Sequence, residues 1–319
     1  PDMETISKIS EGDLSIVSRD NADKIWLLAF SRDKASTSYY SYDRNTKRSQ
    51  FLLKNKAALD PYTLASMEPI QFVSKDCLTI QGYMTFPPGK ERSNLPMVLN
   101  VHGGPWSREG WGYNAQAQWL ANRGYICLQV NFRGSTGYGK NFVNIADKEW
   151  GGAMQQDLTD AVHWAIEKGY ADPKRAAIYG GSYGGYAALA GAAFTPDLFR
   201  CAVDIVGPST LLTFLNTIPP YWNLYRLEFY KRVGDPATEE EFLKSRSPFF
   251  HADRIKIPLL IAQGANDPRV NQQESEQIVA QLKKKGIPHE YLLFPDEGHG
   301  FARPENRLKF YAACEKFLA

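Results

Sequence analysis

One stretch near the middle of the chain constrains the fold more than any other: Ile178-Tyr179-Gly180-Gly181-Ser182-Tyr183-Gly184-Gly185-Tyr186. It contains Gly-x-Ser-x-Gly between an apolar run at 176–179, which predicts a buried strand, and a small-residue segment at 186–194, which predicts a helix. A strand that turns directly into a helix strains its middle residue, and side chains at 180 and 184 would strike the neighbouring strand and helix. The pattern therefore predicts a nucleophile elbow that presents Ser182 at a helix N-terminus, where the dipole favours negative charge.

From about residue 96 onward, apolar runs alternate with helical patterns. The expected strands are 97–101, 126–130, 176–179, 201–206, 258–262 and 291–294. The expected helices include 115–122, a segment around 158–166, 271–285 and 305–318. Continuous apolar strands separated by helices are typical of a sheet covered on both faces. We therefore expect an α/β-hydrolase fold, with a mostly parallel, doubly wound sheet and an antiparallel start at 70–74 and 78–86.

The first part of the chain has a different pattern. Strand candidates at 24–30, 37–42 and 49–53 are separated by polar turns, which predicts an antiparallel meander. Three strands cannot bury both faces alone, so this segment must rest on the main domain or on further chain. An irregular, proline-bearing stretch follows, and we place the domain boundary there. The prediction is a β-rich segment over 1–69 and a catalytic domain over 70–319.

Composition limits the partners and the compartment. A net charge of +2 gives no electrostatic reason to expect nucleic acid or an anionic membrane as a partner. No apolar run is long enough to span a membrane and no signal peptide opens the chain, which starts at Pro1 and is therefore processed or cut from a longer protein. The four cysteines suggest neither a disulfide framework nor a metal cluster, so we expect no metal, no cofactor and a reducing, cytoplasmic location. A homo-oligomer remains open.

A serine at such an elbow needs a base to take its proton and a third group to orient the base. In the α/β-hydrolase arrangement these follow in the order Ser, acid, His, with the base on the loop after the last strand. His299 lies there between two glycines, whereas His163 falls inside a helix and His289 precedes a strand. His251 lies in a connecting segment. His299 is therefore the predicted base.

The orienting acid should lie just past the carboxyl end of a strand. Asp267 does, directly after the apolar run at 258–262 and its glycine turn. Asp204 falls inside its own strand pattern and is the alternative, while Asp296 would have to fold back to reach His299. We therefore predict a catalytic triad of Ser182, Asp267 and His299.

The tetrahedral intermediate of acyl transfer also needs two donors for its oxyanion. One should be the backbone N–H of Tyr183, directly after the nucleophile. The other should come from the loop after an early strand, and His102-Gly103-Gly104-Pro105 stands at that place. The predicted oxyanion hole is therefore formed by Tyr183 with Gly104 or Gly103.

Five motifs in order resemble the catalytic domain of the prolyl oligopeptidase family of serine peptidases. They are His102-Gly103-Gly104-Pro105, Asn131 to Gly139, Gly180 to Gly185, Gly264 to Val270 and Glu297-Gly298-His299-Gly300-Phe301. The resemblance covers roughly residues 70 to 319 and is strongest to the acylaminoacyl-peptidase and dipeptidyl-peptidase branch. It implies the same triad and an oxyanion donor from Gly104 or its neighbour beside Tyr183. Members of this family usually carry a β-propeller ahead of the hydrolase domain, and this sequence departs from that pattern. Residues 1 to 60 are enough for about one propeller blade, so we interpret them as a remnant of such a blade.

The aromatic-rich segment between 207 and 251 predicts the substrate pocket, because an insertion there sits above the elbow in this fold. Phe214, Tyr221 and Trp222 are the predicted substrate-binding residues; the alternative is that these aromatics belong to the core or contact further chain. The predicted function is a serine hydrolase that cleaves short peptides or acyl-peptides by way of an acyl-enzyme. A carboxylesterase that uses the same triad on small acyl esters is the alternative. A non-catalytic binding domain is disfavoured by the intact Ser, Asp and His.

Overall fold

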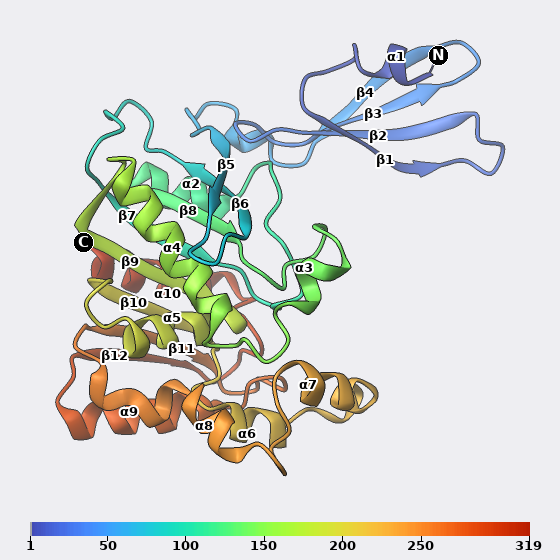
Figure 1. Cartoon of the computed structure of the whole chain (residues 1–319). Coiled ribbons are helices and arrows are strands. Elements are labelled where there is room, and N and C mark those ends of the chain that lie inside the picture. Colours follow the sequence, from blue (N-terminus) through green and yellow to red (C-terminus); the bar gives the residue numbers. More distant parts are fainter. Residues whose placement is uncertain (1) are drawn as a thin grey trace. The chain divides into compact units, whose positions relative to one another are not determined.

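The computed structural model describes residues 2–319 (Figure 1). The chain forms two compact units. One contains the chain up to Pro69 together with 83–91 and 110–127, and the other contains 70–82, 92–109 and 128–319. Among the described residues, no helix has both the length and the apolar character that a membrane crossing requires.

The N-terminal sheet has four antiparallel strands in the order β1-β2-β3-β4. They are β1 (Asp13–Arg19), β2 (Ile25–Ser31), β3 (Ser38–Asp43) and β4 (Arg48–Lys54), preceded by the short helix α1 (Asp2–Ile6). The sequence predicts the last three strands but not β1, most of whose residues are exposed.

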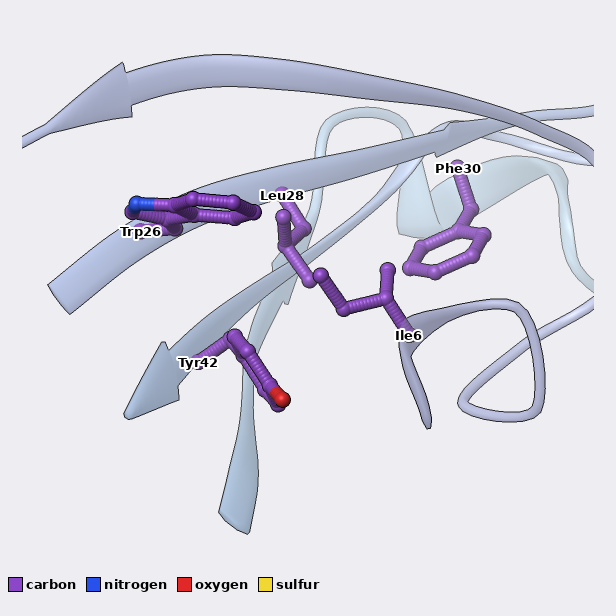
Figure 2. Packing of buried hydrophobic residues seen from close by; sticks show 5 residues of the cluster. All are labelled: Ile6, Trp26, Leu28, Phe30 and Tyr42. Carbon is purple, nitrogen blue, oxygen red and sulfur yellow. The ribbon is translucent and has the colours of Figure 1, made fainter. Parts of the chain in front are cut away.

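This sheet has a core of its own. Trp26, Leu28 and Phe30 alternate along β2 and therefore point to one face, where Tyr42 of β3 and Ile6 of α1 join them. Figure 2 shows the Ile6 side chain reaching in beside Leu28. Leu14 and Ile16 of β1 are partly buried against the same cluster, so both the additional strand and α1 contribute to the core of this unit.

The second sheet has eight strands in the order β12-β11-β10-β9-β7-β8-β6-β5. They are β5 (Met67–Val73), β6 (Thr79–Thr85), β7 (Leu95–Val101), β8 (Ile126–Asn131), β9 (Ala171–Gly181), β10 (Cys201–Ile205), β11 (Leu259–Gly264) and β12 (His289–Phe294). The pairs formed by β7 with β9, β9 with β10, β10 with β11 and β11 with β12 are all parallel. The expected mostly parallel α/β-hydrolase sheet is confirmed.

Helices connect these strands. The long ones are α2 (Ala115–Asn122), α4 (Ala153–Glu167), α5 (Tyr183–Phe194), α9 (Gln272–Lys285) and α10 (Pro304–Leu318). The shorter elements are α3 (Lys140–Asn144), α6 (Leu211–Asn216), α7 (Arg226–Arg232), α8 (Glu240–Ser245) and the 3-10 turns at Ala57–Leu59, Pro220–Tyr225 and Pro248–Arg254. In the sheet, β10, β11 and β12 follow β9 in turn on one side, whereas β8 lies on the far side of β7. The strand order therefore reverses between β7 and β9. Ligands of open α/β sheets bind where the strand order reverses in this way, at the carboxyl ends of the strands.

The start of α9 combines a helix cap with a contact to a second helix. Asn271 caps the helix, because its side chain accepts the N–H of Gln273 at 3.0 Å. Glu274 lies three residues further on, where a capping box would place its reciprocal partner. Its buried carboxylate instead accepts the N–H groups of Ser209 (2.9 Å) and Thr210 (3.0 Å) at the start of α6. Glu274 therefore ties α9 to the segment that carries the predicted pocket residues.

Candidate active site

Ser182 occupies the turn between β9 and α5, with φ of 59° and ψ of −118°. This is a strained conformation for a residue with a side chain. The tight turn depends on the flanking glycines. A Cβ at Gly180 would lie 2.5 Å from the carbonyl carbon of Gly184, and a Cβ at Gly184 would lie 2.1 Å from the carbonyl oxygen of Val101 in β7. The elbow therefore packs backbone against backbone, as its glycine pattern predicts.

Hydrogen bonds hold the elbow on both sides of the serine. The N–H of Ser182 donates to the carbonyl of Ile205 at 2.8 Å, and its carbonyl accepts the N–H of Tyr186 at 3.0 Å. Tyr183 is the first residue of α5, so its N–H belongs to the first turn of the helix, where no intrahelical acceptor exists. A backbone donor thus stands directly beside the half-buried serine.

Asp267 and His299 form a hydrogen-bonded pair. Nδ1 of His299 lies 2.7 Å from Oδ2 of Asp267, whose side chain is fully buried. The second oxygen, Oδ1, accepts the N–H groups of Arg269 at 2.8 Å and Val270 at 3.0 Å. Three donors therefore fix the carboxylate, and it in turn fixes the orientation of the imidazole.

The other two candidate carboxylates, Asp204 and Asp296, have different partners. Asp204 is fully buried, and its Oδ1 accepts the N–H of Gly207 at 2.9 Å. Burial raises the pKa of Asp204 to about 8, so this carboxyl is neutral in neutral solution. Asp296 accepts the amide of Asn306 at 3.0 Å and pairs with Arg303 at 3.0 Å. Neither arrangement orients an imidazole.

The loop that follows β7 lies against the elbow. A Cβ at Gly103 would lie 3.5 Å from Cβ of Ser182 and 3.1 Å from the carbonyl oxygen of Gly181. Gly104 has a φ of 122°, a conformation that residues with side chains rarely adopt. Its N–H donates to no acceptor within residues 2–319. The expected oxyanion loop is therefore close to the serine and has an uncommitted donor.

Beside Ser182 lies a small, largely apolar pocket. It is lined by Gly104, Trp150, Ser182, Tyr183, Pro208, Phe214, Trp222, Phe229, Arg269 and Val270. Two of the expected pocket residues, Phe214 and Trp222, are among them. Tyr221 is not; it is 55% exposed and meets the ring of Trp222 edge-on at 5.8 Å. Trp150 and Arg269 were not expected. No local pattern marks Trp150, because only the folded chain brings this residue, which precedes α4, against Tyr183 of α5 and Phe214 of α6.

The turn at 267–270 connects the two halves of the site. Arg269 and Val270 donate their N–H groups to Asp267, and the same two residues line the pocket beside Ser182. The Asp267–His299 pair and the serine pocket therefore share one short segment. No group of three His, Cys, Asp or Glu side chains in the described part of the chain is arranged to hold a metal ion.

Comparison with known proteins gives one consistent family. Residues 111–319 match the prolyl oligopeptidase family. The whole chain is 50% identical, over 327 aligned residues, to dipeptidyl aminopeptidase BIII of Pseudoxanthomonas mexicana, of which it covers 48%.

Solved structures agree with this. A puromycin-hydrolyzing peptidase of Mycobacterium tuberculosis superposes with a TM-score of 0.85 at 29% identity, over 92% of this chain and 45% of its own. An acylaminoacyl peptidase of Pyrococcus horikoshii gives 0.84 at 26% identity, over 97% of this chain and 50% of its own. The chain thus spans about half the length of the relatives it matches. On its fold, its motifs and these matches, the chain belongs to the prolyl oligopeptidase family of serine peptidases.

Proposed function

We propose that the chain is the catalytic part of a serine peptidase that cleaves short peptides or acyl-peptides through an acyl-enzyme. The observation that carries this proposal is the shared turn at 267–270, which joins the Asp267–His299 pair to the pocket of Ser182. The relatives, a dipeptidyl aminopeptidase and an acylaminoacyl peptidase, support peptides as the substrate class.

In the proposed reaction, Oγ of Ser182 attacks the carbonyl carbon of the scissile bond and its proton passes to Nε2 of His299. Asp267 accepts Nδ1–H and stabilises the imidazolium that forms. The C–N bond then breaks as His299 returns the proton to the leaving amine. Water, deprotonated by the same imidazole, hydrolyses the acyl-enzyme and releases the acid.

Negative charge develops on the carbonyl oxygen in both halves of the reaction. The backbone N–H groups of Tyr183 and Gly104 are the proposed donors to that oxygen, because both residues line the pocket beside Ser182. The N–H of Gly104 has no acceptor among the described residues. The walls formed by Trp150, Phe214 and Phe229 suit an apolar side chain on the acyl side of the cleaved bond.

The decisive variant is Ser182→Ala. Loss of the nucleophile should lower turnover about a millionfold, because the base then has no partner to activate. A fluorophosphonate should label the wild type at Ser182, mapped by mass spectrometry, and should not label the exposed Ser245. A Ser182→Ala protein that keeps a tenth of the wild-type activity would refute the assignment.

Substrate class is tested separately. Aminoacyl and acyl-peptide p-nitroanilides measure amide cleavage, and p-nitrophenyl esters measure ester cleavage with the same chromophore class. The proposal expects turnover of both kinds of substrate. Labelling at Ser182 with turnover of esters alone would make the chain a carboxylesterase.

A further inference from the structure

Glu274, in the first turn of α9, has a buried carboxyl that the proposed reaction does not use. The residue is 1% exposed. Its Oε2 accepts the N–H groups of Ser209 at 2.9 Å and Thr210 at 3.0 Å, and also the side-chain amide of Gln277 at 2.9 Å. The hydroxyl of Thr213 contacts Oε1. Three of these four partners belong to the segment that leads into α6, so the carboxyl joins two elements that are far apart in the sequence.

The segment that Glu274 holds forms one wall of the apolar pocket. Pro208, directly before the two backbone donors, and Phe214, inside α6, both line the pocket. The Phe214 ring stacks on Trp150 with centroids 6.1 Å apart and meets Phe229 edge-on at 6.0 Å. A shift of this segment would therefore move the aromatic surface that lines the pocket.

The helix that carries Glu274 follows the turn at 267–270. That turn contains Asp267, the proposed orienting acid, and its last two residues line the pocket. After a single capping residue, Asn271, the chain enters α9. The carboxyl of Glu274 therefore connects the pocket wall at α6 to the segment from which the proposed acid acts.

The other hydrogen bonds at the start of α6 involve different groups. The N–H of Leu211 donates to Oγ of Ser247 at 2.9 Å. Ser209 and Thr210 are both buried, so their N–H groups would lack an acceptor if the carboxyl of Glu274 were removed and the segment did not move. A buried donor without an acceptor is costly, and this cost favours a displaced or loosened wall.

We propose that Glu274 is a positioning residue for substrate selectivity: its carboxyl holds the wall at 208–214 in a fixed position relative to the turn at 267–270, and so fixes the width of the pocket for the side chain on the acyl side of the cleaved bond. The inference rests on the proposed function of Ser182. A pocket with fixed walls discriminates steeply, because one methylene more or less in an apolar pocket changes kcat/KM by about ten- to two-hundredfold. A loosened wall should reduce this discrimination.

Two variants of similar side-chain length separate the acceptor from the volume that Glu274 fills. Oε2 takes its hydrogens from N–H groups that can only donate, so it is an acceptor in either protonation state of the carboxyl. In Glu274→Gln the amide oxygen can take this place, and the Thr213 hydroxyl can accept from the amide nitrogen. In Glu274→Met the side chain offers no strong acceptor. The matched control is Glu276→Met, at an exposed carboxylate whose partner, Gln272, lies on the same helix.

The readout is kcat/KM for acyl-peptide p-nitroanilides with glycine, alanine, leucine or phenylalanine on the acyl side of the cleaved bond. The ratio between the best and the worst substrate does not depend on the concentration of folded enzyme, so partial unfolding cannot imitate the effect. We expect this ratio to stay within about threefold of the wild type in Glu274→Gln and Glu276→Met, and to fall about tenfold or more in Glu274→Met.

A milder variant covers the case in which Glu274→Met does not fold. Glu274→Asp keeps a carboxyl but shortens the side chain by one methylene, so either the wall moves or its hydrogen bonds break. The ratio between the best and the worst substrate should then fall about fivefold or more.

Labelling by a small alkyl fluorophosphonate reports the nucleophile and its base without filling the pocket. Its rate in Glu274→Met should stay within about threefold of the wild type, because the triad is unchanged. Wild-type selectivity in both Glu274→Met and Glu274→Asp would overturn the inference, and so would a labelling rate that falls as far as the selectivity. A wild type that is neither labelled nor active would instead remove the proposed function, and this role with it.

Discussion

At the scale of single residues, Asp267 and Asp204 are both buried carboxyls near the carboxyl edge of the sheet, and their surroundings separate them. Asp267 faces the His299 imidazole and two backbone donors, whereas Asp204 has one backbone donor. Asp267→Asn should lower kcat by about ten-thousandfold, because the amide would hold the imidazole in the wrong tautomer. Asp204→Asn should leave kcat nearly unchanged. Peptide hydrolysis assays of the two variants check this, and a reversed result would make Asp204 the orienting acid.

Asp204 should instead affect how the free energy of unfolding changes with pH. Burial raises its pKa in the folded chain to about 8 from an ordinary 3.8, so between these values the folded state holds a proton that the unfolded state has released. Folding stability must therefore fall as pH rises through this window. From pH 5 to 8 we expect the wild type to lose roughly 4 kcal/mol of unfolding free energy that Asp204→Asn does not lose.

Urea unfolding of both proteins at pH 5 and pH 8 measures this difference. If the unfolding free energies of the Asn variant and the wild type change in parallel across this pH window, Asp204 is ionised in the folded chain.

The two aspartates also show how much a sequence pattern can predict. Asp204 lies inside an apolar run and Asp267 lies just past one, and this difference predicted that the two carboxyls have different places in the fold. No comparable pattern marks Trp150, which meets Tyr183 of α5 and Phe214 of α6 only in the folded chain.

At the scale of elements, the elbow depends on two backbones that touch. A Cβ at Gly184 would lie 2.1 Å from the carbonyl oxygen of Val101, and backbone cannot rotate away as a side chain can. Gly184→Ala should therefore destabilise the protein by roughly 1–3 kcal/mol or more and lower kcat, because β7 and α5 must separate. Gly181→Ala is the matched control, since its Cβ would meet nothing closer than 3.8 Å.

Thermal unfolding and kcat of the two alanine variants test this prediction. If both variants have similar stability and similar kcat, the elbow relaxes easily.

The elements also show where prediction from sequence ends. Strong apolar runs such as those of β10 and β11 were located correctly because both faces are covered. β1 was not, because a register shift between Ile16 and Ser18 interrupts its alternating pattern. The partner of Glu274 was not, because α6 approaches α9 only in the folded chain.

At the scale of the whole molecule, the chain spans about half the length of its relatives and contains two compact units. The N-terminal sheet buries Leu28 completely against residues of its own unit. A domain boundary near residue 69 remains a prediction, and the core in Figure 2 offers a way to test it.

Leu28→Ala would leave a cavity in that core and should cost roughly 2–5 kcal/mol of local stability, because the site cannot collapse fully. If residues 1–69 are a separate unit, amide hydrogen exchange should speed up in β1–β4 and stay unchanged in β9–β11. Turnover of a short p-nitroanilide should then stay within about twofold of the wild type, since this variant alters no residue of the proposed active site. Leu53→Ala, at a side chain of β4 that is 52% exposed, is the control and should change neither quantity. Equal loss of protection in β9–β11 would show that the two parts unfold as one cooperative unit and that the boundary near residue 69 is wrong.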